Sequence, residues 1–154
     1  MNQATQIICP LTVNFDRSVE GLVKEGDYFK ANHHKLSPIT TEEFPPLEKG
    51  VKKIKVIVFS FGKDISFNEA LLGFQEMKFR HCSTHEFLTL GIEYPDLQRE
   101  FPIVDLSSFR ACHGGGNEVL VLETDQQSRR ILHRVWFGIR WGAKYHFLAI
   151  PQST

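Results

Sequence analysis

The sequence has little of several features that would point directly to a function. It has no net charge at pH 7, because 18 Lys and Arg balance 18 Asp and Glu. This balance gives no general electrostatic attraction to nucleic acid or to an anionic membrane. No apolar run reaches the roughly 18 residues that a membrane-spanning helix needs. We therefore expect no membrane partner, and we do not favour nucleic acid as a partner.

Cysteine is scarce, with three residues at irregular positions: Cys9, Cys82 and Cys112. A disulfide-stabilised secreted domain usually has an even number of cysteines at regular spacings, so we expect three free thiols. The first residues lack the positive charge of a signal peptide, and Pro10 interrupts the apolar run that follows them. We therefore expect a cytoplasmic location, although a protein secreted without a cleaved signal would show the same features.

Motifs that identify a cofactor or a reaction are absent as well. The chain contains no Cys-x-x-Cys, no His-Glu-x-x-His and no Gly-x-Gly-x-x-Gly. The triple glycine at residues 114–116 has no strand-to-helix context, so we interpret it as a turn and not as a phosphate-binding loop. We expect no cofactor.

What is present is typical of one globular protein. The chain has 154 residues, of which 42% are hydrophobic and 13 are Phe, a residue without a polar group and therefore suited to a core. We expect a loose polar tail over residues 1–7 and a single globular domain over residues 8–154. Prolines make residues 27–50 an irregular excursion within that domain.

Two helices have clear start signals. Ser66 with Glu69, and Ser83 with Glu86, each form a capping box. The first box predicts a helix over residues 66–78, with one apolar face and Leu72 on the opposite side. That face comprises Phe67, Ala70, Leu71, Phe74 and Met77. Shorter helical segments are expected after Ser18 and over residues 96–99.

Strand patterns dominate the rest of the chain. Residues 11–15 and 51–61 are expected strands, and four more follow at residues 103–109, 118–123, 130–137 and 144–150. Short glycine-containing or polar links join the last four, which favours an antiparallel meander. The sequence therefore predicts an α+β fold with a mostly antiparallel sheet, a C-terminal meander and two or three short helices.

Several stretches in the second half carry a resemblance. They are residues 79–88, residues 98–104, Val135-Trp-Phe137, Arg140-Trp141 and Phe147-Leu-Ala-Ile150. Together they resemble a family of small uncharacterised bacterial proteins, which implies a bacterial source and no particular activity. A short helix feeding glycine-linked strands is also distantly similar to the C-type-lectin-like fold, including its formylglycine-generating branch. The chain lacks that branch's proline and tryptophan at the helix start, and it has Tyr145-His-Phe147 in place of Gly-Phe-Arg. No site residue is transferred.

Cysteine and histidine gather in two places, and we name these residues as weak candidates for a metal site. They are His81, Cys82, His85, Cys112 and His113. Thiolate and imidazole are zinc ligands, but the cap at Ser83 separates His81 from His85, and small buried cysteines explain the pattern as well. Cys112 beside His113 is a possible nucleophile, although adjacent residues on an extended chain point in opposite directions.

The last acidic residue is Asp125, and the basic segment after it is rich in aromatic residues. Strand alternation over residues 130–137 places Arg130, Leu132, Arg134 and Trp136 on one face. The other face carries Ile131, His133, Val135 and Phe137, a set that we expect in the core. We predict that four of these tail residues form one exposed ligand-binding patch: Arg134, Trp136, Arg140 and Trp141. The alternative is that the tryptophans pack within the sheet and the arginines are solvated or pair with distant carboxylates.

Three functional hypotheses remain open. The first is a non-enzymatic binding module that recognises a protein, a peptide or a small polar ligand through the aromatic and basic surface. The second is a small metal- or thiol-dependent enzyme that uses the region of Cys82 and Cys112. The third is a single-stranded nucleic-acid binder, because arginine and indole side chains can stack on bases.

Overall fold

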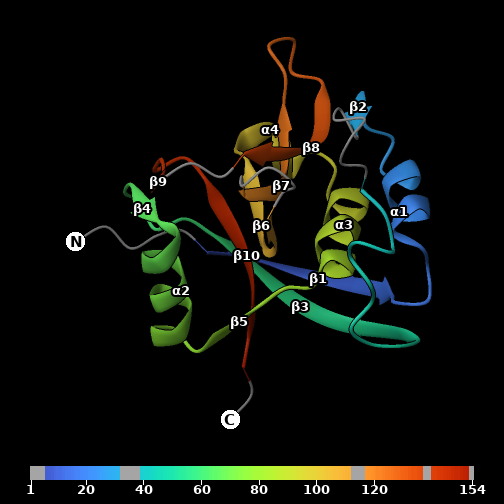
Figure 1. Cartoon of the computed structure of the whole chain (residues 1–154), viewed down its shortest axis with the longest axis horizontal. Helices are drawn as coiled ribbons and strands as arrows, with labels where there is room; N and C mark the ends of the chain where they lie inside the picture. Colours follow the sequence, from blue (N-terminus) through green and yellow to red (C-terminus); the bar gives the residue numbers. More distant parts are fainter. Residues whose placement is uncertain (1–5, 32–38, 112–116, 137–139, 153–154) are drawn as a thin grey trace.

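The computed structural model describes residues 6–31, 39–111, 117–136 and 140–152 (Figure 1). The helices are α1 (Val19–Glu25), α2 (Phe67–Glu76), α3 (Thr84–Glu93) and α4 (Leu97–Glu100). The strands are β1 (Gln6–Asn14), β2 (Lys30–Ala31), β3 (Val51–Phe59), β4 (Ile65–Ser66), β5 (Phe79–His81), β6 (Ile103–Ala111), β7 (Asn117–Thr124), β8 (Arg130–Trp136), β9 (Arg140–Trp141) and β10 (His146–Pro151).

Eight of the strands in the described residues form one sheet. Its order is β1-β3-β10-β6-β7-β8-β2, and β5 pairs with β10 beside this path. The pairings are antiparallel except for β10 with β6 and β2 with β8, so the sheet is mixed but mostly antiparallel. Strands β4 and β9 form a separate antiparallel pair. The α+β prediction is confirmed.

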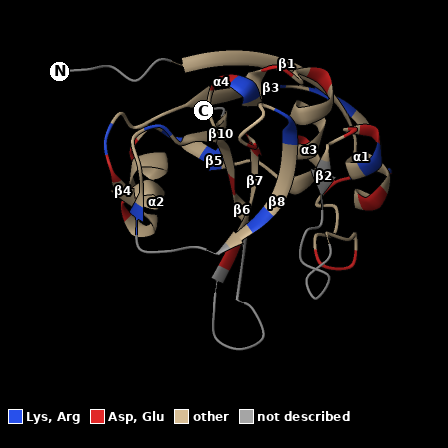
Figure 2. Ribbon diagram, turned by 90° about the horizontal axis from the view of Figure 1, so that it is seen from above, with Lys and Arg blue, Asp and Glu red and all other residues tan. Residues whose placement is uncertain are grey.

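The large sheet has an apolar layer on each face. Helices α1 and α3 lie on one side of it and α2 lies on the other (Figures 1 and 2). Alternate residues of the central strands divide between the two layers. In β3, Val56 and Val58 pack with α1 and α3, whereas Ile57 and Phe59 pack with α2. The central strands are therefore covered on both faces.

The predicted meander is only partly correct. Strands β6, β7 and β8 do follow one another as antiparallel neighbours. Strand β10 does not continue beside β8; it returns to the middle of the sheet, antiparallel to β3 and parallel to β6. The edge position beside β8 is occupied by the two-residue strand β2. A connection longer than a hairpin precedes β10 and allows this crossover.

Both capping boxes have the predicted hydrogen bonds. The hydroxyls of Ser66 and Ser83 accept from the backbone N–H groups of Glu69 and Glu86, whose carboxylates accept from the serine N–H groups. The short helix after Ser18 is likewise capped by that serine. Four helices lie in the described residues, against the two or three that we expected for the whole fold. The short α1 and α4 correspond to the helical segments expected after Ser18 and over residues 96–99.

The beginning of the chain corrects one boundary. Strand β1 starts at Gln6 and pairs with β3 along its whole length, so residues 6 and 7 belong to the sheet and not to a tail. Within the expected excursion, Ile39 and Phe44 are buried in the core of the α1 and α3 side. No helix among the described residues is long and apolar enough to cross a membrane.

Candidate functional site

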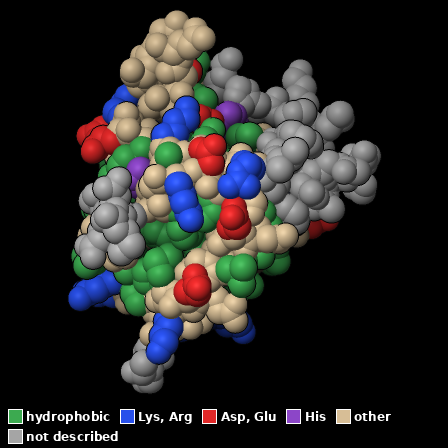
Figure 3. All heavy atoms as spheres, turned by 90° about the vertical axis from the view of Figure 1, so that its left-hand side faces the viewer, with side chains coloured by type: hydrophobic (Ala, Val, Ile, Leu, Met, Phe, Trp, Pro, Cys, Tyr) green, Lys and Arg blue, Asp and Glu red, His purple; other side chains and the backbone are tan. Residues whose placement is uncertain are grey.

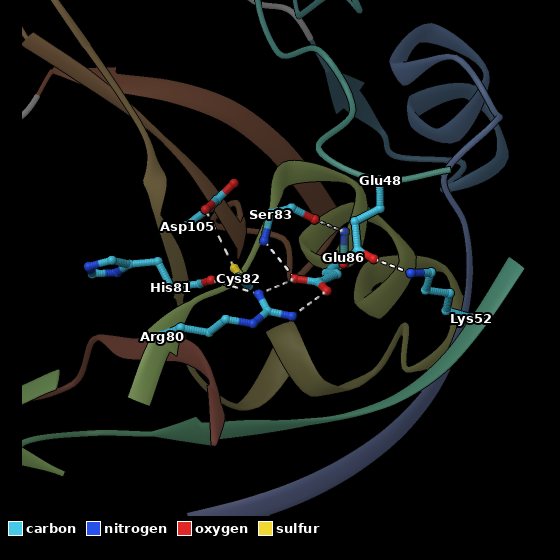
Figure 4. Close-up of polar contacts among 8 residues, drawn as sticks. All are labelled: Glu48, Lys52, Arg80, His81, Cys82, Ser83, Glu86 and Asp105. Carbon is cyan, nitrogen blue, oxygen red and sulfur yellow. Dashed lines mark hydrogen bonds and ion pairs between the residues drawn. The ribbon is translucent and has the colours of Figure 1, made fainter. Parts of the chain in front are cut away.

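Cys82 lies in a buried polar cluster between β5 and β6. Its Sγ is 3.5 Å from Oδ1 of Asp105 (Figure 4). The Asp105 carboxylate also accepts hydrogen bonds from the hydroxyl of Thr84 and from Ser107. Asp105 is fully buried. Burial raises the pKa of its carboxyl to about 6, although the four hydrogen bonds oppose this shift. The cluster is a satisfied internal network.

The chemistry of Cys82 argues against a nucleophile. Burial, and after it the neighbouring Asp105 carboxylate, raises the pKa of the Cys82 thiol well above its usual value. A nucleophilic cysteine needs a lowered pKa and access to solvent, and Cys82 is buried. Cys9 is also a buried free cysteine, and burial raises the pKa of its thiol. The cysteines in the described residues therefore behave as core residues.

The candidate metal ligands do not converge where the structure describes them. The His81 ring stacks on Phe74 on the α2 side of the sheet and points away from Cys82 (Figure 4). His85 lies on the other side, stacked on Phe15, with Nε2 2.9 Å from the carbonyl oxygen of Arg17. No group of three His, Cys, Asp or Glu in the described part of the chain could hold a metal. Residues Cys112 and His113, and the triple glycine, lie outside it.

Arg134 corrects our predicted patch. It is only 8% exposed, and its guanidinium forms ion pairs with Glu43 at 2.6 Å and with Glu118 at 3.1 Å. The same group lies over the ring of Phe44, 5.4 Å from its centroid. Arg134 was expected on an exposed face of β8, but Glu43 and Phe44 cover its side chain. Arg134 therefore anchors this segment to the sheet.

The other residues of the predicted patch do not form a common exposed surface either. Trp141 is 6% exposed and packs in the α2-side core against Tyr145 and Phe147. Arg140 is exposed, but it pairs with Glu69 of α2. For Trp136 the structure describes the backbone, as the last residue of β8, and not the side chain. A single exposed patch of these residues is therefore wrong for Arg134 and Trp141, because both side chains are buried.

A hollow of about 710 Å³ lies where three connections meet. One connection follows α1, another joins α3 to α4, and the third is the turn between β7 and β8. The lining is basic, aromatic and polar: Asp27, Tyr28, Phe29, Pro95, Asp96, Arg99, Gln127, Ser128, Arg129 and Arg130. We call it the arginine hollow. Its volume lies within the roughly 300–1,000 Å³ of typical small-molecule sites.

Arg130 forms the buried end of the arginine hollow. It is 9% exposed, and its two Nη atoms donate to the carbonyls of Gly26 and Gly91 at 2.6 Å each. Its guanidinium lies 4.6 Å from the centroid of the Tyr28 ring. This ring enters between the two glycines: an added Cβ would lie 2.3 Å from the ring at Gly26 and 2.1 Å from the hydroxyl at Gly91. Burial raises the pKa of Tyr28 to about 12, so its hydroxyl stays protonated.

The half-exposed arginines of the hollow are held in place by neighbours. Arg99 donates to Asp96 and to the carbonyl of Ser128. Arg129 donates to Asp125 and to the side chain of Gln127, and its guanidinium stacks 3.6 Å from the centroid of the Phe29 ring.

The turn between β7 and β8 orders this part of the site. The Asp125 carboxylate accepts from the backbone N–H groups of Gln127 and Arg129, which closes the turn and directs Arg129 toward Phe29. Phe29 is in turn tied to β8, because its N–H donates to the carbonyl of Arg130. Both walls of the hollow are thus joined to the same strand.

A smaller and more apolar hollow of about 360 Å³ runs along α2. Phe61, Ile65, Leu72 and Met77 contribute its apolar lining, with Lys63, Glu69 and Glu76 among the charged residues. Figure 3 shows hydrophobic side chains gathered in the middle of the face that includes α2, with charges of both signs around them. It has no buried polar group aimed into it that would specify a ligand.

The sequence contained only part of the signal for the arginine hollow. The basic residues after Asp125 include Arg129 and Arg130, but Tyr28, Phe29 and Arg99 come from distant segments without a recognisable motif. Comparison with known proteins adds no analogy, because no family model, curated protein or solved structure matches the chain. The resemblances noted in the sequence therefore stay predictions.

Proposed function

We propose that the protein is a non-enzymatic binding module that recognises a small polar ligand in the arginine hollow. One observation carries the proposal: three arginines and two aromatic side chains from separate segments line a single cavity of small-molecule size. The proposed site is still aromatic and basic, as the sequence predicts for the binding surface. It lies at Arg129 and Arg130 and not at Arg134 and Trp141.

The hollow is preorganised for binding. Arg99 and Arg129 are fixed by side-chain and backbone acceptors, so little side-chain entropy is lost when a ligand docks. Polar donors and an exposed ring lie side by side, as in many ligand sites. The enzyme hypothesis has weaker support, because Cys82 and Asp105 are buried away from any described cavity.

Binding can be tested by titrating ¹⁵N-labelled protein with a panel of small amino acids, sugars, organic acids and nucleosides. We expect chemical-shift changes centred on the backbone amides of Phe29, Ser128 and Arg129 for at least one compound. Arg129→Ala should weaken that compound about tenfold or more, because a hydrogen bond to a charged group is lost. Arg140→Ala, which removes an exposed arginine on the α2 side, should leave the affinity unchanged.

Two results would contradict this proposal. One is a panel in which no compound perturbs the hollow. The other is a compound that binds but perturbs the α2 hollow, around Leu72 and Met77, instead. A short single-stranded oligonucleotide in the same panel tests the nucleic-acid hypothesis, since binding through successive stacked bases would extend the shifts beyond the hollow.

A further inference from the structure

We infer that the ligand of the arginine hollow is a small organic anion that bears a carboxylate or a phosphoryl group. This inference rests on the proposed function, and it adds the chemical class of the ligand. It follows from the charge that the hollow leaves without a counter-ion and from the donors that its arginines leave unused.

The first step concerns Arg130. A guanidinium does not lose its proton in proteins, so the buried side chain carries a full positive charge. Its two Nη atoms donate to backbone carbonyls, and no carboxylate lies within ion-pair distance of it among the described residues. Asp27 also lines the hollow but makes no ion pair with it. A buried charge without a counter-ion is unfavourable, and an anion in the adjoining hollow would offset this cost.

The second step concerns Arg99 and Arg129. Each is neutralised by one carboxylate, Asp96 and Asp125 respectively, so these pairs do not compensate Arg130. Each nevertheless keeps one Nη, Nη2 of Arg99 and Nη1 of Arg129, without a hydrogen-bond partner in the part of the chain that the structure describes. Donors of this kind match the oxygens of carboxylate and phosphate groups.

The third step concerns size and shape. Inorganic phosphate would fill only a small part of a 710 Å³ hollow. Phe29 is half exposed, and Arg129 stacks on its ring, which offers an apolar surface beside the cations. An organic anion can place its charged group between the arginines and its apolar part against Phe29.

The test uses two pairs of probes that differ mainly in charge: benzoate with benzamide, and phenyl phosphate with phenol. We expect both anions to shift the amide signals of Ser128 and Arg129, and the neutral partners to bind at least tenfold more weakly. Raising NaCl from about 50 to about 500 mM should weaken the anions, because salt screens exposed charges. Arg129→Gln and Arg99→Gln should each weaken the anions about tenfold, whereas Arg140→Gln should change nothing.

Arg130 needs a separate variant, because its loss would release Gly26 and Gly91. Arg130→Lys keeps the charge and should retain anion binding if the protein stays folded by circular dichroism. Equal binding of charged and neutral probes at the hollow would overturn the inference and leave the proposed function standing. If neither anion binds but another compound of the wider panel binds in the hollow, the inference is likewise overturned and the proposed function stands. If nothing in either set perturbs the hollow, the proposed function fails as well.

Discussion

At the scale of single residues, Arg134 and Arg140 show how burial decides what an arginine does. Both lie in the basic tail, and neither has a carboxylate after it in the sequence. The partners come from earlier in the chain: Glu43 and Glu118 for Arg134, and Glu69 for Arg140. The sequence of the tail alone therefore predicts two unpaired arginines, whereas both arginines form ion pairs in the folded chain.

The two arginines should differ sharply in their contribution to stability. Arg134→Ala should destabilise the protein by about 3–5 kcal/mol, because it leaves the buried carboxylate of Glu118 without its cation. Arg140→Ala should leave the free energy of unfolding almost unchanged, since its pair is about half exposed and screened by solvent. Urea titrations of the two variants measure the change in the free energy of unfolding. Similar losses for both would show that Arg134 does not anchor a buried pair.

At the scale of secondary-structure elements, α2 follows its sequence pattern closely. The capping box sets its start at Ser66, and the expected faces are found: Phe74 is 2% exposed and Leu72 is 59% exposed. Met77 departs from the pattern, because it lies beyond the last helical residue and is exposed. Periodicity works here because one side of the helix faces the sheet and the other faces solvent.

This asymmetry leads to a paired prediction for α2. Phe74→Ala should cost about 3–5 kcal/mol, because it leaves a cavity among the rings of Phe59, Phe79 and His81. Leu72→Ala should cost far less, because its side chain is mostly in water already. Denaturant titrations of the two variants measure these losses, because a shift in the midpoint at an unchanged m value reports a change in the free energy of unfolding. Equal losses would mean that the helix packs on the sheet through a different face.

At the scale of the whole molecule, the buried Asp105 makes stability depend on pH. Its pKa is about 6 in the folded protein against an ordinary value of 3.8, so the folded state binds this proton more tightly than the unfolded state does. Stability from this group is thus fully present below about pH 4 and is lost as the pH rises through about 6, an effect on the order of 3 kcal/mol. Asp105→Asn should remove this part of the pH dependence.

The comparison with Asp105→Asn isolates the effect from other titrations. Several other carboxylates, among them Glu20 and Asp125, have lowered pKa values and act in the opposite direction, losing stability as the pH falls. These carboxylates are present in the unmodified protein and in Asp105→Asn, so their effects cancel in the difference between the two free energies of unfolding. Urea titrations between about pH 4 and about pH 7 should therefore give a difference that changes steadily. A constant difference would show that Asp105 has an ordinary pKa.

The sequence by itself determined the features that depend on neighbours along the chain. The capping boxes at Ser66 and Ser83, the two faces of α2 and the strand that begins at Val51 all follow from local hydrogen bonding and periodicity. The α+β class followed from the order of these elements. Each of these properties is set within a few residues, so a single sequence contains the information needed to predict it.

Only the tertiary structure decided which faces are covered and which distant segments meet. Alternation in β8 was visible, but it cannot show that Glu43 and Phe44 cover Arg134, because a strand buried on both faces has no solvent side. The return of β10 to the centre of the sheet was not predicted either, because its pairing with β3 and β6 joins segments that are far apart in the sequence. The arginine hollow depends on contacts between residues about 100 positions apart, such as Arg130 with Gly26. Such contacts arise from packing, for which the local sequence carries no signal.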